Sequence, residues 1–423
     1  MPNSKKTILA GAFGNALEWY DFTTYAFFAP IFAELFFPSH DPSVSLLMTF
    51  SVFALGFFVR PIGAFFFGYL GDRIGRRKAL ITSIILMSLP TFLLGFLPTY
   101  ATIGFGAPLL LTILRLLQGA AVSGELTSAA AYLVENASEH RRGLAGSLVM
   151  CSAFIGISLS SAIATIVTQF ITHAQLLAWG WRVPFIFGGF IGLRGLIIRL
   201  HSTESNLFQQ AKAAQGQETT TSFLSHIREV LLQATVWKAI LLTCIMAVGN
   251  WFFIGFFNTF LIKTKGLPVK WVMLINFISL TFFTFLLPLM GMLSDSLGRK
   301  PVFRMGLIGF LLFSIPIFWL LNQGDLGAAL LGELFFAIVL SFIAAIIPTA
   351  LAELFQVRTR NSGMALGYNI SLALFGGTAP LVAVALIAHT GSHYSPAYYL
   401  MVCALISGWA LSQIKESYQE KLA

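Results

Sequence analysis

Two acidic side chains and one arginine could do chemistry, because each lies inside a long apolar stretch of the sequence. Glu18 and Asp21 are three residues apart, so a helix would place them on adjacent parts of one face. Two carboxylates in apolar surroundings can both stay ionised only when a cation lies near them. Arg115, inside another apolar stretch, is the obvious candidate for that cation. The three residues predict either a site that binds protons or a charged ligand, or a structural pair between helices.

Two further polar residues share the stretch that contains Arg115. Gln118 and Glu125 are seven residues apart, which places them on one stripe of a helix. Glu125 could take part in the same chemistry as Arg115. It could instead form a structural ion pair with Arg60, Arg141 or Arg142.

Aromatic side chains surround the acidic pair. Trp19, Tyr20 and Tyr25 lie within a few residues of Asp21, and Asn15 lies one turn before Trp19. Aromatic faces beside a carboxylate suit a quaternary ammonium ligand, because the ring face attracts cations. Trp and Tyr are equally common at lipid interfaces, so that interpretation stays open.

A second group of polar and aromatic residues lies in the other half of the sequence. Its members, expected to line the opposite wall of a cavity, are Asn250, Trp251, Asn258, Tyr368 and Asn369. Amide side chains can bind the carboxylate of a ligand or the backbone of their own helix. Both interpretations remain possible from the sequence.

Composition identifies the elements that must position these residues. Of 423 residues, 57% are hydrophobic and 10% are charged, whereas soluble domains carry about 25% charged residues. Apolar runs of a length that crosses a bilayer recur throughout the chain. We expect helices at roughly 8–37, 43–71, 79–98, 102–134, 143–171, 183–200, 237–262, 270–293, 301–321, 326–352, 362–389 and 396–414.

The distribution of positive charge predicts the orientation. The net charge is +9, but most Lys and Arg residues fall on one side of the expected helices. The small group on the other side consists of Arg182, Lys263, Lys265 and Lys270. This asymmetry follows the positive-inside rule, so we expect both termini in the cytoplasm. It accounts for the basic charge without a nucleic-acid partner.

An internal repeat predicts two related halves. The only long polar segment, 201–236, separates six expected helices from six. GYLGDRIGRRK follows the second helix, and GMLSDSLGRKP follows the eighth. We expect a bundle at 1–200, a cytoplasmic linker at 201–236, and a second bundle at 237–423 that includes a short tail.

The repeated loop has the residues of a conformational switch. Its glycines allow close helix approach and a tight turn, and its carboxylates can bind helix N-termini and arginines. Such contacts can close one conformation and break in another. The corresponding residues are Gly68, Asp72 and Arg76 in the first copy and Gly291, Asp295 and Arg299 in the second.

These motifs resemble the major facilitator superfamily, and within it the metabolite:proton symporter family. The resemblance rests on the doubled loop and on segments such as NALEWYDFTTYAFFAPIFAELFFP, LLAWGWRVPFIFGGFIGL and AELFQVRTRNSGMALGYNISLALFGGTAP. SPAYYLMV and EWYDF are similar to the proline/betaine branch, and LLMTFSVFALGFFVRPIGA is similar to citrate carriers as well. Members of the family usually have a pair of glycines before the glutamate of the fourth helix, whereas this chain has Ser123-Gly124 before Glu125.

The resemblance implies an all-α membrane protein with twelve helices in two pseudo-symmetric six-helix bundles. It implies a proton-coupled secondary transporter of a proline- or betaine-like zwitterion that works by alternating access. It also places the first and fourth helices side by side, so Asp21 and Arg115 are expected to pair. The alternatives are an organic-acid symporter for dicarboxylate, citrate or shikimate-like substrates, and an exporter of the same fold.

Several further expectations complete the interpretation. We expect no enzymatic activity, since no catalytic constellation is visible, and no metal site or cofactor beyond the proton gradient as driving force. Partners are expected to be a small-molecule substrate, protons and the lipid bilayer. We expect a monomer in the cell inner membrane.

Overall fold

The computed structural model describes residues 2–63, 76–121, 125–200, 232–356, 359–418 and 420. The predicted switch residues Gly68 and Asp72 lie outside the described residues. Arg76 and Glu125 each begin a described helix, but their side chains are likewise outside the description.

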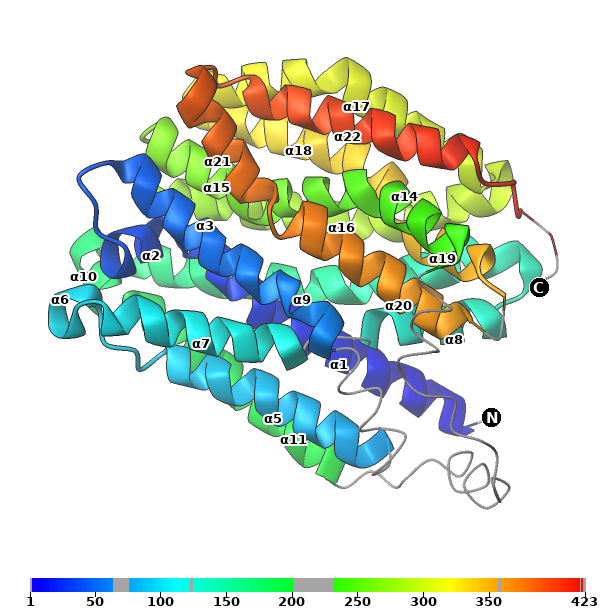
Figure 1. Ribbon diagram of the computed structural model, residues 1–423, viewed down its shortest axis with the longest axis horizontal. Helices are drawn as coiled ribbons and strands as arrows, with labels where there is room; N and C mark the ends of the chain where they lie inside the picture. Colours follow the sequence, from blue (N-terminus) through cyan, green and yellow to red (C-terminus); the bar gives the residue numbers. More distant parts are fainter. Residues whose placement is uncertain are drawn as a thin grey trace.

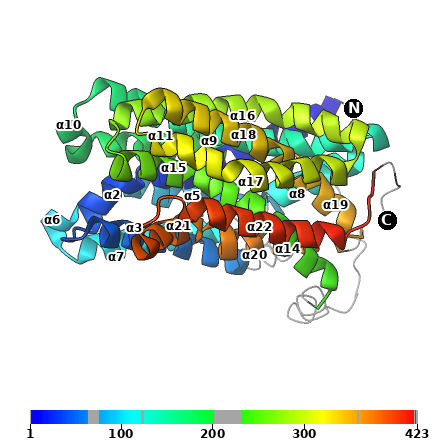
Figure 2. The same cartoon turned by 90° about the horizontal axis from the view of Figure 1, so that it is seen from above.

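Long helices run along one common direction in both views of the molecule (Figures 1 and 2). The helices of the first half are α1 (Pro2–Phe27), α2 (Ala29–Phe36), α3 (Pro42–Phe58), α5 (Arg76–Leu94), α6 (Tyr100–Ile103), α7 (Gly106–Ala121), α8 (Glu125–Asn136), η1 (Glu139–Arg141), α9 (Arg142–Phe170), α10 (His173–Ala178), η2 (Gly180–Arg182) and α11 (Val183–Leu200).

The second half continues the same arrangement. Its helices are α14 (Ala234–Trp251), η3 (Phe252–Phe256), α15 (Phe257–Thr259), η4 (Phe260–Thr264), α16 (Val269–Leu297), α17 (Arg299–Asn322), α18 (Leu326–Ala344), α19 (Ile347–Leu354), α20 (Arg360–Ser371), η5 (Leu372–Gly376), α21 (Ala379–Thr390) and α22 (Ser395–Ser412). Three of these segments, η3, η4 and η5, are π-helical.

The helices have the length and composition of membrane spans. Among the described residues, nine helical segments are long and apolar enough to cross a bilayer. They begin at Pro42, Gly106, Glu139, Ala234, Val269, Arg299, Leu326, Arg360 and Ser395. Together with the α1–α2 segment, α5 and α11, they account for the twelve expected helices. The all-α membrane fold predicted from the sequence is confirmed.

The contact between the two halves is formed by helices of both halves. Helix α9 packs along α16, and α1 packs along α9 and also contacts η3. Both chain termini lie at the same end of the molecule, whereas α2, α6 and α10 lie at the opposite end (Figure 1). We call the first the Asp295 end and the second the Lys263 end, after a residue found at each.

Candidate functional site

Arg115 is fully buried at the middle of the first half. It projects from α7, with 0% of its surface exposed. Its Nη1 donates to Gln118 Oε1 at 3.0 Å and to the Phe22 carbonyl at 3.4 Å. Its guanidinium carbon lies 4.4 Å from the ring centres of Phe22 and of Tyr25. In the described part of the chain, Nε and Nη2 have no hydrogen-bond partner.

Asp21 reaches Arg115 only indirectly. Gln118 Nε2 donates to the Thr91 hydroxyl at 2.7 Å. That hydroxyl donates to the Met87 carbonyl at 2.9 Å and also lies beside the Asp21 carboxyl. The predicted direct Asp21–Arg115 pair is therefore wrong for this conformation. Asp21 faces α5 and α11, and a relay through Thr91 and Gln118 separates the two charges.

The absence of a side chain at Gly188 lets Asp21 face α11. A Cβ atom added to Gly188 would lie 2.8 Å from Asp21 Oδ1 and 2.9 Å from a Tyr20 ring carbon. Both distances are too short for a carbon atom, so glycine is required for this packing. Asp21 Oδ2 finds no hydrogen-bond partner among the described residues.

Arg60 is a buried cation beside Arg115's aromatic neighbours that the predicted site did not include. It lies just beyond the end of α3 and is 1% exposed. Its guanidinium carbon lies 4.2 Å from the Phe22 ring centre, and it interacts electrostatically with Glu18 and Tyr368. Nε and Nη2 have no partner among the described groups. The sequence offered a usable signal, because Arg60 is a charged residue inside the expected helix 43–71, but it was considered only as an ion-pair partner of Glu125.

Glu18 and Asp21 therefore belong to different surroundings. Glu18 interacts with Arg60 and with Tyr368 of the second half, so its group spans the two halves. Asp21 lies within the first half. The spacing of three residues placed both on α1 but could not show that neighbouring helices divide them.

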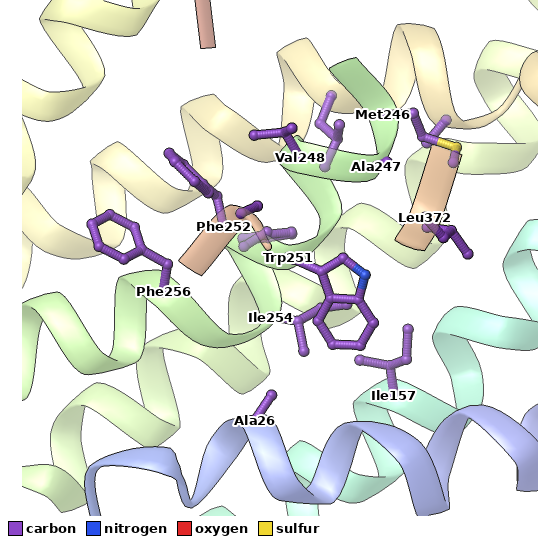
Figure 3. Close-up of a cluster of buried hydrophobic side chains, with 14 of the residues drawn as sticks. Ala26, Ile157, Met246, Ala247, Val248, Trp251, Phe252, Ile254, Phe256 and Leu372 are labelled. Atoms are coloured by element: carbon purple, nitrogen blue, oxygen red, sulfur yellow. The ribbon is translucent and has the colours of Figure 1, made fainter. Parts of the chain in front are cut away.

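Two tryptophans join the halves beside this charged group. Trp19 of α1 and Trp251 of α14 are stacked, with ring centres 6.3 Å apart and planes at 28°. Trp251 also contacts Phe53 and Phe57 of α3, at 4.8 Å and 5.0 Å between centres. Figure 3 shows the Trp251 indole lying between α14 and the neighbouring residues Ala26 and Ile157 of the first half.

The predicted amide side chains differ in their contacts: some donate to backbone carbonyls, and some have a buried oxygen that accepts no hydrogen bond among the described residues. Asn258 and Asn369 donate to carbonyls one turn earlier in their own helices, Ile254 and Ala365. Asn15 joins α1 to α9, donating to the Val149 carbonyl and to Ser152. Asn250 is 2% exposed, and its Oδ1 has no partner in the described chain.

The remaining predicted aromatic residues also differ in their contacts. Tyr25 donates its hydroxyl to the Thr49 carbonyl of α3 at 2.9 Å. The Tyr368 hydroxyl is buried and has no hydrogen-bond partner among the described residues. Tyr368 thus adds an unfilled donor beside Arg60.

The second copy of the repeated loop joins the halves at the Asp295 end. Asp295 accepts hydrogen bonds from the backbone nitrogens of Gly143 and Leu144, at 2.7 Å and 2.8 Å, at the start of α9. A helix N-terminus favours such a carboxylate. Arg299 binds Asp295 at 2.9 Å and Glu353 at 3.1 Å.

Two glycines of this loop have distinct structural reasons. Gly298 has a φ of +98°, which L side chains rarely adopt, and it forms the turn between α16 and α17. A Cβ on Gly291 would lie 2.6 Å from the Ser147 Cβ atom and 2.7 Å from the Gly143 carbonyl. Close approach of α16 to α9 therefore depends on Gly291.

Other contacts close both ends of the interface. At the Asp295 end, Arg360 of α20 binds Glu135 of α8 at 2.6 Å. At the Lys263 end, Lys263 forms an ion pair with Glu34 of α2. The halves are thus in contact at both ends of the central charged group.

A cavity of about 200 Å³ at the Asp295 end lies apart from this group. It is bounded by α17, α19, α22 and the following tail, and Arg299 is the predicted site residue among its lining. Glu416 in the tail accepts from the backbone nitrogens of Arg299 and Lys300. This cavity therefore lies at the Asp295 end and is separate from the group around Arg60 and Arg115.

Comparison with known proteins gives the family. The Major Facilitator Superfamily model matches residues 11–380. The chain is 33% identical over 409 residues to the proline/betaine transporter of Escherichia coli (strain K12), covering 95% of this chain and 81% of that protein. It is 33% identical over 410 residues to the glycine betaine/proline/ectoine/pipecolic acid transporter OusA of Dickeya dadantii (strain 3937), with the same coverage.

Solved structures share the fold. The proton:xylose symporter XylE bound to 6-bromo-6-deoxy-D-glucose superposes with a TM-score of 0.77 at 18% identity, covering 98% of this chain and 96% of that one. Another D-xylose–proton symporter structure gives 0.75 at 20% identity, covering 98% of this chain and 99% of that one. The chain belongs to the major facilitator superfamily, and it is a multi-pass membrane transporter rather than an enzyme.

Proposed function

We propose that this transporter couples proton movement to transport of a small zwitterion of the proline or betaine type. The observation that carries the substrate class is the buried pair Arg60 and Arg115. Each guanidinium keeps two nitrogens without hydrogen-bond partners among the described residues. An arginine fork binds a carboxylate through two hydrogen bonds, so the carboxylate of the substrate would fill these donors.

The other half of the zwitterion has matching chemistry nearby. Trp19 and Trp251 present aromatic faces, and Glu18 adds a carboxylate beside them. Aromatic faces attract quaternary and secondary ammonium groups. A ligand with one carboxylate and one ammonium fits this surface better than a tricarboxylate, which would bring its additional charges against Glu18.

The ammonium subsite would lie at the contact between the halves, where Trp19 stacks on Trp251. The rings are in contact here, so an ammonium group enters only when the halves separate. Binding would then favour a particular arrangement of the two bundles, which is the requirement for alternating access.

Asp21 is the residue to which we assign proton coupling. It is 2% exposed, and it connects through Thr91 and Gln118 to Arg115. Adding or removing its proton changes the charge at one end of this relay. The other end is a substrate-binding guanidinium, so the two ligands would influence each other through the relay.

For topology and assembly we keep the arrangement that the sequence predicts. We propose two bundles at 1–200 and 237–423, joined by a cytoplasmic linker at 201–236. The Asp295 end would face the cytoplasm of a cell inner membrane, and the transporter would act as a monomer without a cofactor. The charge asymmetry of the loops supports this orientation.

A thermal-shift screen of the purified protein tests the substrate class. Glycine betaine and proline should raise the melting temperature by mass action, whereas citrate, 2-oxoglutarate and shikimate should not. Reduced shifts in Arg60→Lys and Arg115→Lys protein would assign the effect to this site. A shift with citrate or shikimate alone would favour the organic-acid alternative and remove the zwitterion proposal.

A further inference from the structure

A second buried carboxyl group lies in the other half of the transporter, away from Asp21. Glu333 is the eighth residue of α18 and is 0% exposed. Asn276 is the eighth residue of α16 and is also 0% exposed. At 1.5 Å rise per residue, both lie roughly 10 Å from the first residue of their helices. Helix α16 begins just after η4, which contains Lys263, and α18 follows α17 back from the Asp295 end, so both helices begin at the Lys263 end.

The surroundings of Glu333 contain oxygen atoms that lack hydrogen-bond donors. Asn276 Nδ2 donates to Glu333 Oε2 at 3.3 Å and to the Phe253 carbonyl at 2.9 Å. The Ser279 hydroxyl lies one turn along α16, near the carboxyl group. Among the described residues, Glu333 Oε1, Asn276 Oδ1 and Ser279 Oγ have no hydrogen-bond partner.

No ion pair compensates a charge on Glu333 within the described part of the chain. The charged residues on the helices packed against α18 lie near helix ends: Lys238, Lys270, Asp295, Arg299, Lys300, Arg304 and Glu353. The other titratable group there is the buried Cys244 thiol of α14. Aromatic rings fill the space around α18, with Phe336 contacting Phe253 and Phe257.

A proton satisfies these atoms better than a metal ion does. An ionised carboxylate in such surroundings, without a counter-charge, is costly. The neutral acid has an O–H group that can donate a hydrogen bond to Ser279 Oγ or Asn276 Oδ1. A metal ion would need lone pairs converging on it, but Asn276 already directs an amide hydrogen at Glu333 Oε2.

The same asparagine connects Glu333 to the wall of the proposed substrate site, and this step rests on the proposed function. Phe253 lies in η3, the π-helical segment that directly follows Trp251. Separation of Trp251 from Trp19 would displace η3 and disturb the Asn276 bonds. We propose that Glu333 is a proton-binding site of the second half, separate from Asp21 and exchanging with water from the Lys263 end.

Infrared spectroscopy of the purified full-length transporter tests this site without any substrate. The C=O stretching band of protonated carboxyl groups should lose one component in Glu333→Gln at neutral pH. Asp325→Asn is the matched control, because it removes an exposed carboxylate at the start of the same helix. It should leave that component in place.

Two further variants keep the test valid if Glu333→Gln does not fold. Asn276→Leu removes the donor to Oε2, so the Glu333 component should move to higher frequency. Glu34→Gln removes the ion pair at the Lys263 end. If water enters from that end, the component should then disappear at lower pH than in wild type, because hydration stabilises the ionised form.

Three results would overturn the proposal. An unchanged band in Glu333→Gln means that the carboxyl group is ionised. An unchanged titration in Glu34→Gln means that the proton does not exchange from the Lys263 end. A loss of the wild-type component when K⁺ is replaced by Na⁺ means that the site holds a metal cation. The proline/betaine proposal stands or falls separately, since none of these measurements uses a substrate.

Discussion

At the scale of single residues, Phe22 organises the charged group. The guanidinium groups of Arg60 and Arg115 lie 4.2 Å and 4.4 Å from its ring centre. Cation–π contact partly compensates the lost hydration of each arginine without occupying its hydrogen-bond donors. The two arginines therefore remain buried and still available to a ligand.

Replacing either arginine by lysine should weaken substrate binding at least about tenfold, or roughly 1.4 kcal/mol. Lysine keeps the charge but lacks the planar fork that binds both carboxylate oxygens. Calorimetric titration of Arg60→Lys and Arg115→Lys with glycine betaine measures the loss. Arg182→Lys, at the Lys263 end, is the control and should bind as wild type does. Wild-type affinity in Arg115→Lys would exclude that residue from the site.

Asp21→Asn should abolish accumulation driven by a pH gradient and preserve counterflow exchange. The asparagine cannot bind or release a proton, but it leaves the Gln118–Arg115 contact intact. Uptake into proteoliposomes, with and without the gradient, measures both activities. Loss of both activities together with a lower melting temperature would indicate a structural role for Asp21.

At the scale of elements, close helix packing rather than hydrophobic pattern positions the site. Helix α11 approaches α1 at Gly188, and α16 approaches α9 at Gly291. Small residues let membrane helices come this close. The positions of the carboxylates Asp21 and Asp295 thus depend on residues that carry no chemistry themselves.

Gly188→Ala should destabilise the protein by about 1–3 kcal/mol, the usual effect of overpacking. The added methyl group would collide with Asp21 and Tyr20. Gly408→Ala is the control, because a Cβ atom added there would lie 3.5 Å from a Leu307 methyl carbon, which is an ordinary van der Waals distance. Thermal unfolding monitored by tryptophan fluorescence compares the two variants. Equal melting temperatures would contradict the packing described for α11.

The sequence predicted the helices well because apolar runs of bilayer length are a strong signal. It also placed Glu18, Asp21 and Arg115 on the correct helices. Contacts between helices were harder to predict. Which side of α1 each carboxylate faces depends on α5, α11 and α3, and the relay through Thr91 joins residues far apart in sequence. Arg60 was left out of the predicted site because the sequence suggested only a structural pair with Glu125, and its contacts with Phe22, Glu18 and Tyr368 join distant parts of the chain.

At the scale of the whole molecule, the two bundles are joined at both ends in this conformation. The Lys263–Glu34 pair joins one end, and Asp295 binds the start of α9 at the other. Opening either end requires breaking its own set of contacts while the other set persists. The relative strength of the two sets therefore determines which side the transporter favours at rest.

Glu34→Gln and Asp295→Ala should shift this balance in opposite directions. Each removes contacts at one end, so the first favours opening at the Lys263 end and the second at the Asp295 end. Asp295→Ala should also slow transport while substrate affinity stays within a few-fold, because the loop is far from the arginines. Distances between spin labels placed in each half, at each end, measure the shift. If the distances change in the same direction in both variants, the two ends do not close independently of each other.

The stacked indoles of Trp19 and Trp251 have an optical consequence. Aromatic chromophores held this close couple their electronic transitions, which gives paired circular-dichroism signals of opposite sign in the near ultraviolet. Because one indole belongs to each half, the coupling should decay whenever the halves move apart. The molecule thus contains an intrinsic spectroscopic reporter of its own cycle, one that needs no label and responds at the point where the substrate is expected to enter.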